Sequence, residues 1–284
     1  MKVLSNLTLT VLFFLLFACK SATKKEKIST TKPSTKTANV MVLDTSFVIE
    51  KISAKPKKVW LYLPPDYETS TKNYPVIYMH DGQNLFDDAT SFIGEWGVDE
   101  LLNKLYEKTK KGFIVVAPEN GGELRTEEYT PWTHEKYGGG KGDAYIQFIK
   151  NDLKPFIDKN YRTKSGPQHT ALIGSSLGGL ISYYGGLKYP ETFGKLGVLS
   201  PSFWFSKEVI PFTETYAKNN TLKMYFLLGE KEGMTKEFNA TINFLISSGF
   251  PKENVTSKIV PSGEHNETFW KSEFLEVIKF LYDI

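Results

Sequence analysis

The residues best suited to covalent chemistry in this sequence lie between Gly174 and Gly178, in the run Gly-Ser-Ser-Leu-Gly. The run follows an apolar stretch at 170–174 that is typical of a buried strand, and it precedes a helical pattern over 177–188. A G-x-S-x-G run between a strand and a helix is a nucleophile elbow, a sharp turn that exposes a serine above a sheet. Only Ser176 has glycines two residues away on both sides. A turn of this kind can also serve packing alone, so the motif needs partners.

The first partner is a base, because a serine hydroxyl is a weak nucleophile until its proton is removed. The chain has four histidines. Those at 80, 134 and 169 precede Ser176, whereas His265 follows the last predicted strand, where the chain order serine, acid, histidine places the base. We therefore expect His265 to be the base, with a surface-loop histidine as the alternative interpretation.

The second partner is an acid that orients the imidazole and stabilises its charged form. It should lie in the loop after the preceding predicted strand, at 224–228. That loop offers two carboxylates, Glu230 and Glu232, on either side of Lys231. We choose Glu232, which is followed by Gly233, and keep Glu230 as the alternative; the other glutamate would be a solvated partner of Lys231.

Acyl transfer also requires hydrogen-bond donors for the oxyanion. One donor should be the backbone N–H of Leu177, directly after the serine and at the start of a helix. The other should come from the loop His-Asp-Gly-Gln-Asn at 80–84, where the glycine permits a turn that aims the backbone N–H of Gln83 inward. These two amides are the predicted oxyanion hole.

Three carboxylates near this loop, those of Asp81, Asp87 and Asp88, raise the question of a calcium site. They lack the ligand spacing of an EF-hand loop. The single cysteine, Cys19, excludes an intramolecular disulfide and a multi-cysteine metal site. We therefore expect the chemistry to need neither a metal nor a cofactor.

Apolar runs alternate with helical patterns through most of the chain. Strands are predicted at 47–49, 58–63, 75–80, 113–117, 170–174, 196–199, 224–228 and 255–260, and helices at 96–108, 143–160, 177–188, 235–248 and 268–282. This alternation indicates a parallel sheet with helices on both faces. Functional residues of such sheets gather at the carboxyl ends of the strands, where the predicted serine, acid and histidine all lie. We expect one α/β domain over 40–284.

The amino-terminal part of the chain has a different composition. A lysine near the start is followed by a short apolar stretch that ends in Leu-Phe-Ala-Cys, with Cys19 last. Twelve apolar-rich residues span about 18 Å as a helix, too little for a bilayer core of about 30 Å. The segment 1–18 is therefore predicted to be a signal peptide that resembles those of bacterial lipoproteins, with Cys19 as the lipidated residue. The Lys-, Ser- and Thr-rich residues 19–39 are predicted to be a flexible tether.

Composition and charge exclude several classes of protein. Hydrophobic residues make up 40% of the 284 residues and charged residues 24%, which argues against a disordered chain, a collagen-like fibre or a disulfide scaffold. Seven of the 35 basic residues and one of the 32 acidic residues lie within 1–38, so the rest of the chain carries a net charge of −3. A mildly acidic folded part argues against binding of nucleic acid.

Taken together, these motifs resemble the putative-esterase family of the α/β-hydrolase superfamily, which includes feruloyl, acetylxylan and siderophore esterases, S-formylglutathione hydrolase and mycolyltransferases. The resemblance covers about 46–284 and rests on the runs at 78–86, 128–132, 138–145, 174–179 and 263–267, with Trp270 downstream. It implies an α/β-hydrolase fold with a mostly parallel, twisted sheet of about eight strands, and a Ser-His-Glu triad at Ser176, His265 and Glu232.

We expect a lipid-anchored serine esterase in the cell envelope of a bacterium, acting on an acetyl or feruloyl ester of a carbohydrate. Trp132, Phe203 and Trp204 are candidates for stacking on a sugar or an aromatic acyl group, and packing is an equal alternative for them. A siderophore trilactone as substrate and acyl transfer to a sugar are alternatives within the same chemistry. A catalytically silent binding lipoprotein on the same fold is the alternative from a different class.

Overall fold

A central sheet of eight strands organises the computed structural model, which describes residues 32–218 and 220–284. Its order is β1 (Val40–Val42), β4 (Val59–Tyr62), β6 (Ile114–Pro118), β5 (Val76–Met79), β9 (Thr170–Ser175), β10 (Lys195–Leu199), β11 (Lys223–Gly229) and β12 (Val255–Val260). The pairs β1–β4 and β4–β6 are antiparallel, and every pair from β6 to β12 is parallel. This confirms the predicted mostly parallel α/β sheet.

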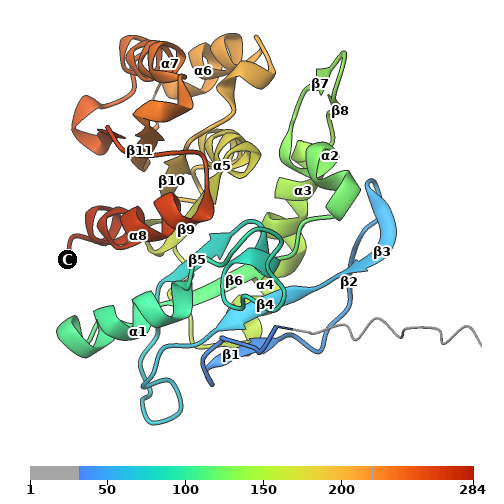
Figure 1. The fold of residues 1–284 in the computed structure, drawn as a ribbon, viewed down its shortest axis with the longest axis vertical. Coiled ribbons are helices and arrows are strands. Elements are labelled where there is room, and N and C mark those ends of the chain that lie inside the picture. Colours follow the sequence, from blue (N-terminus) through green and yellow to red (C-terminus); the bar gives the residue numbers. More distant parts are fainter. Residues whose placement is uncertain (1–31, 219) are drawn as a thin grey trace, which may run out of the picture. The chain divides into compact units, whose positions relative to one another are not determined.

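Helices cover both faces of this sheet (Figure 1). One face packs against α1 (Val98–Thr109) and α8 (Glu267–Tyr282), and the other against α3 (Gly142–Phe148), α4 (Lys154–Asn160), α5 (Leu177–Lys188), α6 (Val209–Ala217) and α7 (Thr235–Ser247). In β5, Ile77 and Met79 join the core under α1 and α8, whereas Val76 and Tyr78 join the core on the α5 side. Because side chains alternate along a strand, one short apolar run supplies both cores.

The predicted helix at 143–160 is divided into α3 and α4 by a π-helical turn at 149–153. Helix α6 and strand β1 had no prediction. Strand β1 is apolar throughout but only three residues long, and two of these residues are exposed.

Two small antiparallel sheets lie outside the central one (Figure 1). Strand β2 (Phe47–Ile49), which was predicted, pairs with β3 (Ser53–Lys57). Strand β7 (Thr133–His134) pairs with β8 (Gly138–Gly139) inside the long polar loop after β6, which also contains a short helix, α2 (Arg125–Tyr129). This loop approaches the active-site end of the sheet, as described below.

Residues upstream of the predicted domain boundary at residue 40 contact the folded part, within a compact unit that spans Lys32–Ile284. The Ser34 hydroxyl donates to Asp87 Oδ2 at 2.6 Å. The Thr37 hydroxyl and backbone N–H both donate to Asp99 Oδ2, at 2.8 and 2.7 Å. Hydroxyl-rich composition is typical of linkers, and only the fold brings these distant carboxylates to it.

Within the described part of the chain, none of the helices has the length and apolar character needed to cross a membrane. The predicted signal peptide at 1–18, Cys19 and the first part of the predicted tether lie outside the described residues.

Candidate active site

The backbone at Ser176 has the geometry of a nucleophile elbow. Strand β9 ends at Ser175 and α5 begins at Leu177, and between them Ser176 has φ 59° and ψ −123°. A non-glycine residue in such a conformation costs of order 1–3 kcal/mol and is held only by its surroundings. The Ser176 N–H donates to the carbonyl of Leu199 at 3.0 Å, and its hydroxyl lies 3.3 Å from the Ser202 hydroxyl.

The glycine at 174 is a steric requirement of this turn. A Cβ at position 174 would lie 2.7 Å from the backbone of Gly178 and 2.7 Å from the His80 ring. Real Cβ atoms do not approach other atoms so closely, so the sharp turn from β9 into α5 needs a residue without a side chain here. The first glycine of the motif is therefore explained by the close approach of strand and helix, whereas a Cβ at Gly178 would make ordinary contacts of 3.4 Å or more.

A carboxylate holds His265 in place. His265 follows β12, and its Nδ1 lies 2.7 Å from Glu232 Oε2. The Glu232 side chain is 1% exposed, whereas that of His265 is 39% exposed. Glu230, the alternative acid, is exposed and has no side-chain hydrogen bond among the described residues. The geometry therefore favours Glu232 as the partner of His265.

Two hydrogen bonds hold the other carboxylate oxygen of Glu232, Oε1. Glu232 Oε1 accepts hydrogen bonds from the Gly229 N–H at 2.8 Å and from the Ser200 hydroxyl at 2.7 Å. Ser200 in turn accepts from the Trp270 indole N–H at 2.9 Å, and the Trp270 ring meets the His265 ring edge-on, with centroids 5.0 Å apart. Glu232 Oε1 thus accepts two hydrogen bonds from the protein, and Oε2 contacts the imidazole of His265.

Ser176 and His265 line the same cavity, which has a volume of about 940 Å³. Its apolar wall includes Met79, Trp96 and Trp270. Within residues 32–218 and 220–284, no hydrogen bond joins Ser176 to His265, and none is made by His265 Nε2. Catalytic hydrogen bonds often tighten only when the substrate is bound. The nitrogen opposite Glu232 is therefore available to a hydroxyl in this cavity.

The two predicted oxyanion donors are the amides of Gln83, which lines this cavity, and of Leu177, which directly follows the cavity residue Ser176. Leu177 is the first residue of α5. Gln83 lines the cavity from the 3₁₀ turn at Gly82–Asn84, which follows β5. A Cβ at Gly82 would lie 2.2 Å from the carbonyl oxygen of Ala117, so the turn can press against β6 only with glycine there.

The three aromatic residues predicted to stack on the substrate, Trp132, Phe203 and Trp204, do not line this cavity. Phe203 is 3% exposed and packs on Tyr183 in the core, with centroids 5.1 Å apart. Trp132 packs edge-on against Tyr184 and Phe212. Trp204 is 48% exposed but lies outside the cavity walls. Residues next to a strand end can turn into the core or away from the cavity, and the sequence does not distinguish these outcomes.

The rings that do line the cavity are Trp96, Trp270 and Phe92. Phe92 and its neighbour Ile93 are 86% and 63% exposed and lie in the loop between Asp87 and Trp96. Two apolar side chains at a cavity edge are a surface on which an apolar ligand can be partly covered. Sequence reasoning missed them, although an apolar pair inside a polar loop is a usable signal.

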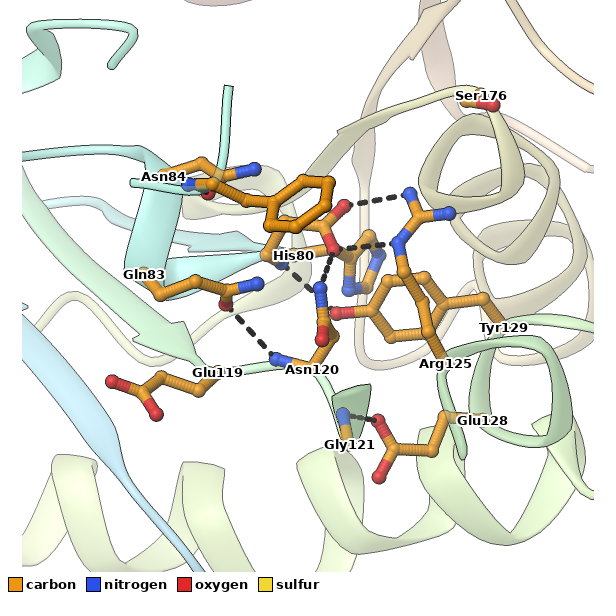
Figure 2. A network of polar contacts seen from close by, with 12 residues as sticks. His80, Gln83, Asn84, Glu119, Asn120, Gly121, Arg125, Glu128, Tyr129 and Ser176 are labelled. Atoms are coloured by element: carbon orange, nitrogen blue, oxygen red, sulfur yellow. Dashed lines mark hydrogen bonds and ion pairs between the residues drawn. The ribbon is translucent and has the colours of Figure 1, made fainter. Parts of the chain in front are cut away.

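A network of charged and polar groups lies beside Gln83, and sequence reasoning missed its main members (Figure 2). Asp81 accepts two hydrogen bonds from the Arg125 guanidinium, at 2.7 and 2.9 Å, and a third from the Asn120 side chain at 2.5 Å. Although burial opposes it, the charge of Arg125 holds the pKa of Asp81 below its ordinary value. Both partners come from the long polar loop, whose contacts cannot be read from composition.

His80, at the end of β5, is a buried structural histidine. Its Nδ1 lies 2.9 Å from the Tyr145 hydroxyl and its Nε2 lies 3.0 Å from the Ser182 hydroxyl. Because Ser182 donates its own proton to the carbonyl of Gly178, His80 donates from Nε2 and accepts at Nδ1. Burial lowers the pKa of His80 to about 3, against the opposing attraction of Asp81.

This burial predicts a loss of stability in mild acid. Between pH 6.5 and about 3 an unfolded chain protonates His80 and the folded chain does not, so the free energy of unfolding falls as the pH is lowered. At pH 5 the loss from this one group is about 2 kcal/mol relative to neutral pH. Urea unfolding at pH 7 and pH 5 measures it, and His80→Gln should show a smaller difference. An NMR titration in which the His80 ring is protonated above pH 5 would contradict the prediction.

Comparison with known proteins gives the family. A family model described as "Putative esterase" matches residues 52–281. The chain belongs to this esterase family. It is therefore a hydrolase that acts on esters, and its family agrees with the resemblance seen in the sequence.

Individual relatives and structures support the assignment. This esterase is 30% identical over 244 residues to the Uncharacterized protein YbbA of Bacillus subtilis, covering 80% of this chain and 92% of the relative. It is 28% identical to the Endo-1,4-beta-xylanase/feruloyl esterase of Xylanibacter ruminicola, covering 70% of this chain and 26% of that protein. The enterobactin esterase FES from Shigella flexneri has the same fold, with a TM-score of 0.68, 16% identity, and coverage of 88% and 61%.

Proposed function

We propose that this esterase is a serine carboxylic-ester hydrolase whose triad is Ser176, His265 and Glu232. The observation that carries the proposal is the 2.7 Å contact between Glu232 and His265 Nδ1, beside the cavity that also contains the strained Ser176 elbow. A carboxylate that accepts a hydrogen bond from Nδ1 keeps the imidazole proton on that nitrogen, so that Nε2 can accept a proton.

The reaction follows from these positions. His265 Nε2 takes the proton of the Ser176 hydroxyl as Oγ forms a bond to the ester carbonyl carbon. The amides of Gln83 and Leu177 stabilise the oxyanion of the tetrahedral intermediate. The C–O bond to the alcohol then breaks, and the alcohol leaves with the proton held on His265. Water, deprotonated by His265, attacks the acyl-enzyme in the same way and releases the acid and free Ser176.

For the substrate we propose an acetyl or feruloyl ester of a carbohydrate. The cavity has an apolar wall that suits an acyl group, formed by Met79, Trp96 and Trp270. Outside it, Trp204 and Tyr137 are each 48% exposed and meet edge-on at 5.9 Å, and exposed rings of this kind suit a sugar. The Xylanibacter relative is, by its name, a feruloyl esterase as well as an endo-1,4-beta-xylanase, which supports this choice.

A siderophore trilactone is the second candidate, because the Shigella structure with the same fold is that of an enterobactin esterase. Transfer of the acyl group to a sugar would use the same intermediate with a sugar hydroxyl in place of water. Hydrolysis rates on acetylated xylan, methyl ferulate and a catecholate trilactone separate the candidates. We expect the highest kcat/KM on one of the first two, and a preference for the trilactone would replace the proposed substrate.

Covalent labelling separates an enzyme from a catalytically silent binding protein on the same fold. A fluorophosphonate reacts with a serine only when a base activates it and an oxyanion hole accepts the negative charge. The protein should gain one adduct, located by mass spectrometry on the peptide that contains Ser176. An unlabelled protein would favour the binding lipoprotein.

We also propose that the chain is anchored in the bacterial cell envelope through Cys19. The support is the apolar stretch before Cys19 and the tether after it. Acyl chains on this residue would hold the protein on a membrane, since more than one chain gives stable anchoring. In cell fractions, Cys19→Ser should leave the protein unprocessed or release it from the membrane. An unchanged membrane fraction for Cys19→Ser, with a mass that differs from wild type only by the substitution itself, would contradict the anchor.

A further inference from the structure

Asp81 joins β5 to the turn that carries Gln83, and its backbone is in the left-handed region. Its φ is 58° and its ψ is 45°. Such a conformation is uncommon for a residue with a side chain, although aspartate tolerates it better than most. The direction in which the chain leaves Asp81 decides where the next two backbone N–H groups point, and the second of them is the Gln83 amide.

Four hydrogen bonds hold Asp81 from outside its own strand. Arg125 donates from Nε and Nη2 to the two carboxylate oxygens, and Asn120 donates from its side chain. The backbone N–H of Asp81 donates to the Tyr129 hydroxyl at 2.9 Å. Figure 2 shows Asn120, Arg125 and Tyr129 gathered beside Gln83. A forked guanidinium contact fixes the angle of a carboxylate as well as its position.

The segment 119–129, which supplies these donors, is held by further hydrogen bonds and an ion pair. The Asn120 N–H donates to the Gln83 side chain at 3.2 Å, and the Gly121 N–H donates to Glu128 at 2.8 Å. Glu128 also forms a buried ion pair with Lys57 at 2.6 Å. The support of the Gln83 turn therefore extends through two segments, 119–129 and β3, that contribute none of the triad residues.

A role in stability alone explains this arrangement poorly. A buried ion pair often contributes little net stability, because both charges lose their hydration. The Asp81 residue is 8% exposed, and the side chain of Arg125 is 29% exposed at the cavity that contains Ser176. Fixed geometry at this cavity is what the oxyanion hole requires, since a donor displaced by about 1 Å can cost about 100-fold in rate.

We propose that Arg125 and Asn120 are positioning residues that hold Asp81 in its left-handed conformation and so aim the Gln83 N–H at the ester oxyanion. The inference rests on the proposed serine mechanism. Neither residue needs to contact the substrate. The long loop after β6 thus supports the catalytic turn in addition to forming part of the cavity wall.

The test is Arg125→Gln, assayed on a p-nitrophenyl ester. A misplaced oxyanion donor reduces the stabilisation of the transition state more than the binding of the ester. We therefore expect kcat to fall about 100-fold and KM to change less than about threefold. The Ki of phenylboronic acid, whose adduct on Ser176 places an oxygen at the oxyanion position, should rise in parallel. The matched control is Lys188→Gln, which removes a cation of similar exposure from an ion pair with Asp143 and should leave all three constants unchanged.

A double-mutant cycle separates positioning from direct binding. Asparagine tolerates the left-handed region, so Asp81→Asn mainly removes the charge that Arg125 holds. If Arg125 acts through Asp81, Arg125→Gln should cause little further loss of kcat in the Asp81→Asn protein. Additive losses, or a loss confined to KM, would overturn the inference in favour of an Arg125 that binds the substrate directly.

Asn120→Ala gives a second test that does not remove a charge and serves if Arg125→Gln does not fold. It should lower kcat about 10-fold, with the same parallel rise in the Ki of phenylboronic acid. Full kcat and full inhibitor affinity in both variants would disprove the positioning role while wild-type activity and Ser176 labelling still stand. A wild-type protein that lacks both would instead disprove the proposed function.

Discussion

Replacing Ser176 by alanine should reduce kcat for ester hydrolysis by about 10⁴- to 10⁶-fold, because no acyl-enzyme can form without the hydroxyl. KM should change little, since the cavity walls that contact the ester are untouched. Initial rates on a p-nitrophenyl ester over a range of substrate concentrations measure both constants, and fluorophosphonate labelling should be lost in the same variant.

The matched control is Ser175→Ala, the neighbouring serine of the same run. Ser175 is buried at the end of β9, whereas Ser176 is partly exposed at the cavity. Ser175→Ala should retain labelling and most of the activity. If Ser176→Ala kept more than about a tenth of the wild-type kcat, the hydrolysis would have to use another nucleophile and the proposed triad would be wrong.

The second large effect is expected for Glu232→Gln, which should lower kcat by about 10⁴-fold. The amide oxygen should take the place of Oε1, where the Gly229 N–H and the Ser200 hydroxyl both donate. The amide NH₂ group must then face His265 Nδ1. That contact places the imidazole proton on Nε2, and an Nε2–H cannot accept the proton of Ser176.

Glu230→Gln is the control for this prediction, because it makes the same chemical change two residues away, on an exposed side chain. It should leave kcat within about twofold of wild type. Kinetics of the two variants on one ester decide between the two carboxylates that the sequence leaves open. A larger loss from Glu230→Gln than from Glu232→Gln would reverse the assignment.

The fold could be predicted because its strands are marked by short apolar runs in the sequence. Runs such as Val76–Met79 are apolar on both faces, because the parallel strands are covered by helices on both sides. The elbow was equally readable from local spacing, and at Gly174 the absence of a side chain is a steric requirement of the turn. Strand β1 was missed because its apolar run is only three residues long, and helix α6 because it is short and contains Pro211.

The roles of the loops were less readable. The aromatic residues proposed to stack on the substrate pack in the core or outside the cavity, whereas Phe92 and Trp96 line it. The last part of the segment predicted as a tether contacts carboxylates through Lys32, Ser34 and Thr37. In each case the partner lies far away in the sequence, and loop composition carries no information about it.

The sequence by itself determined the chain order of serine, acid and histidine and the alternation of strands and helices, because both depend on local spacing and periodicity. Only the tertiary structure decided that Glu232 rather than Glu230 bonds to His265, and that Arg125 and Asn120 support the turn of Gln83. These are contacts between segments far apart in the chain. Their geometry is set by how the loops pack at the carboxyl edge of the sheet, which no local pattern encodes.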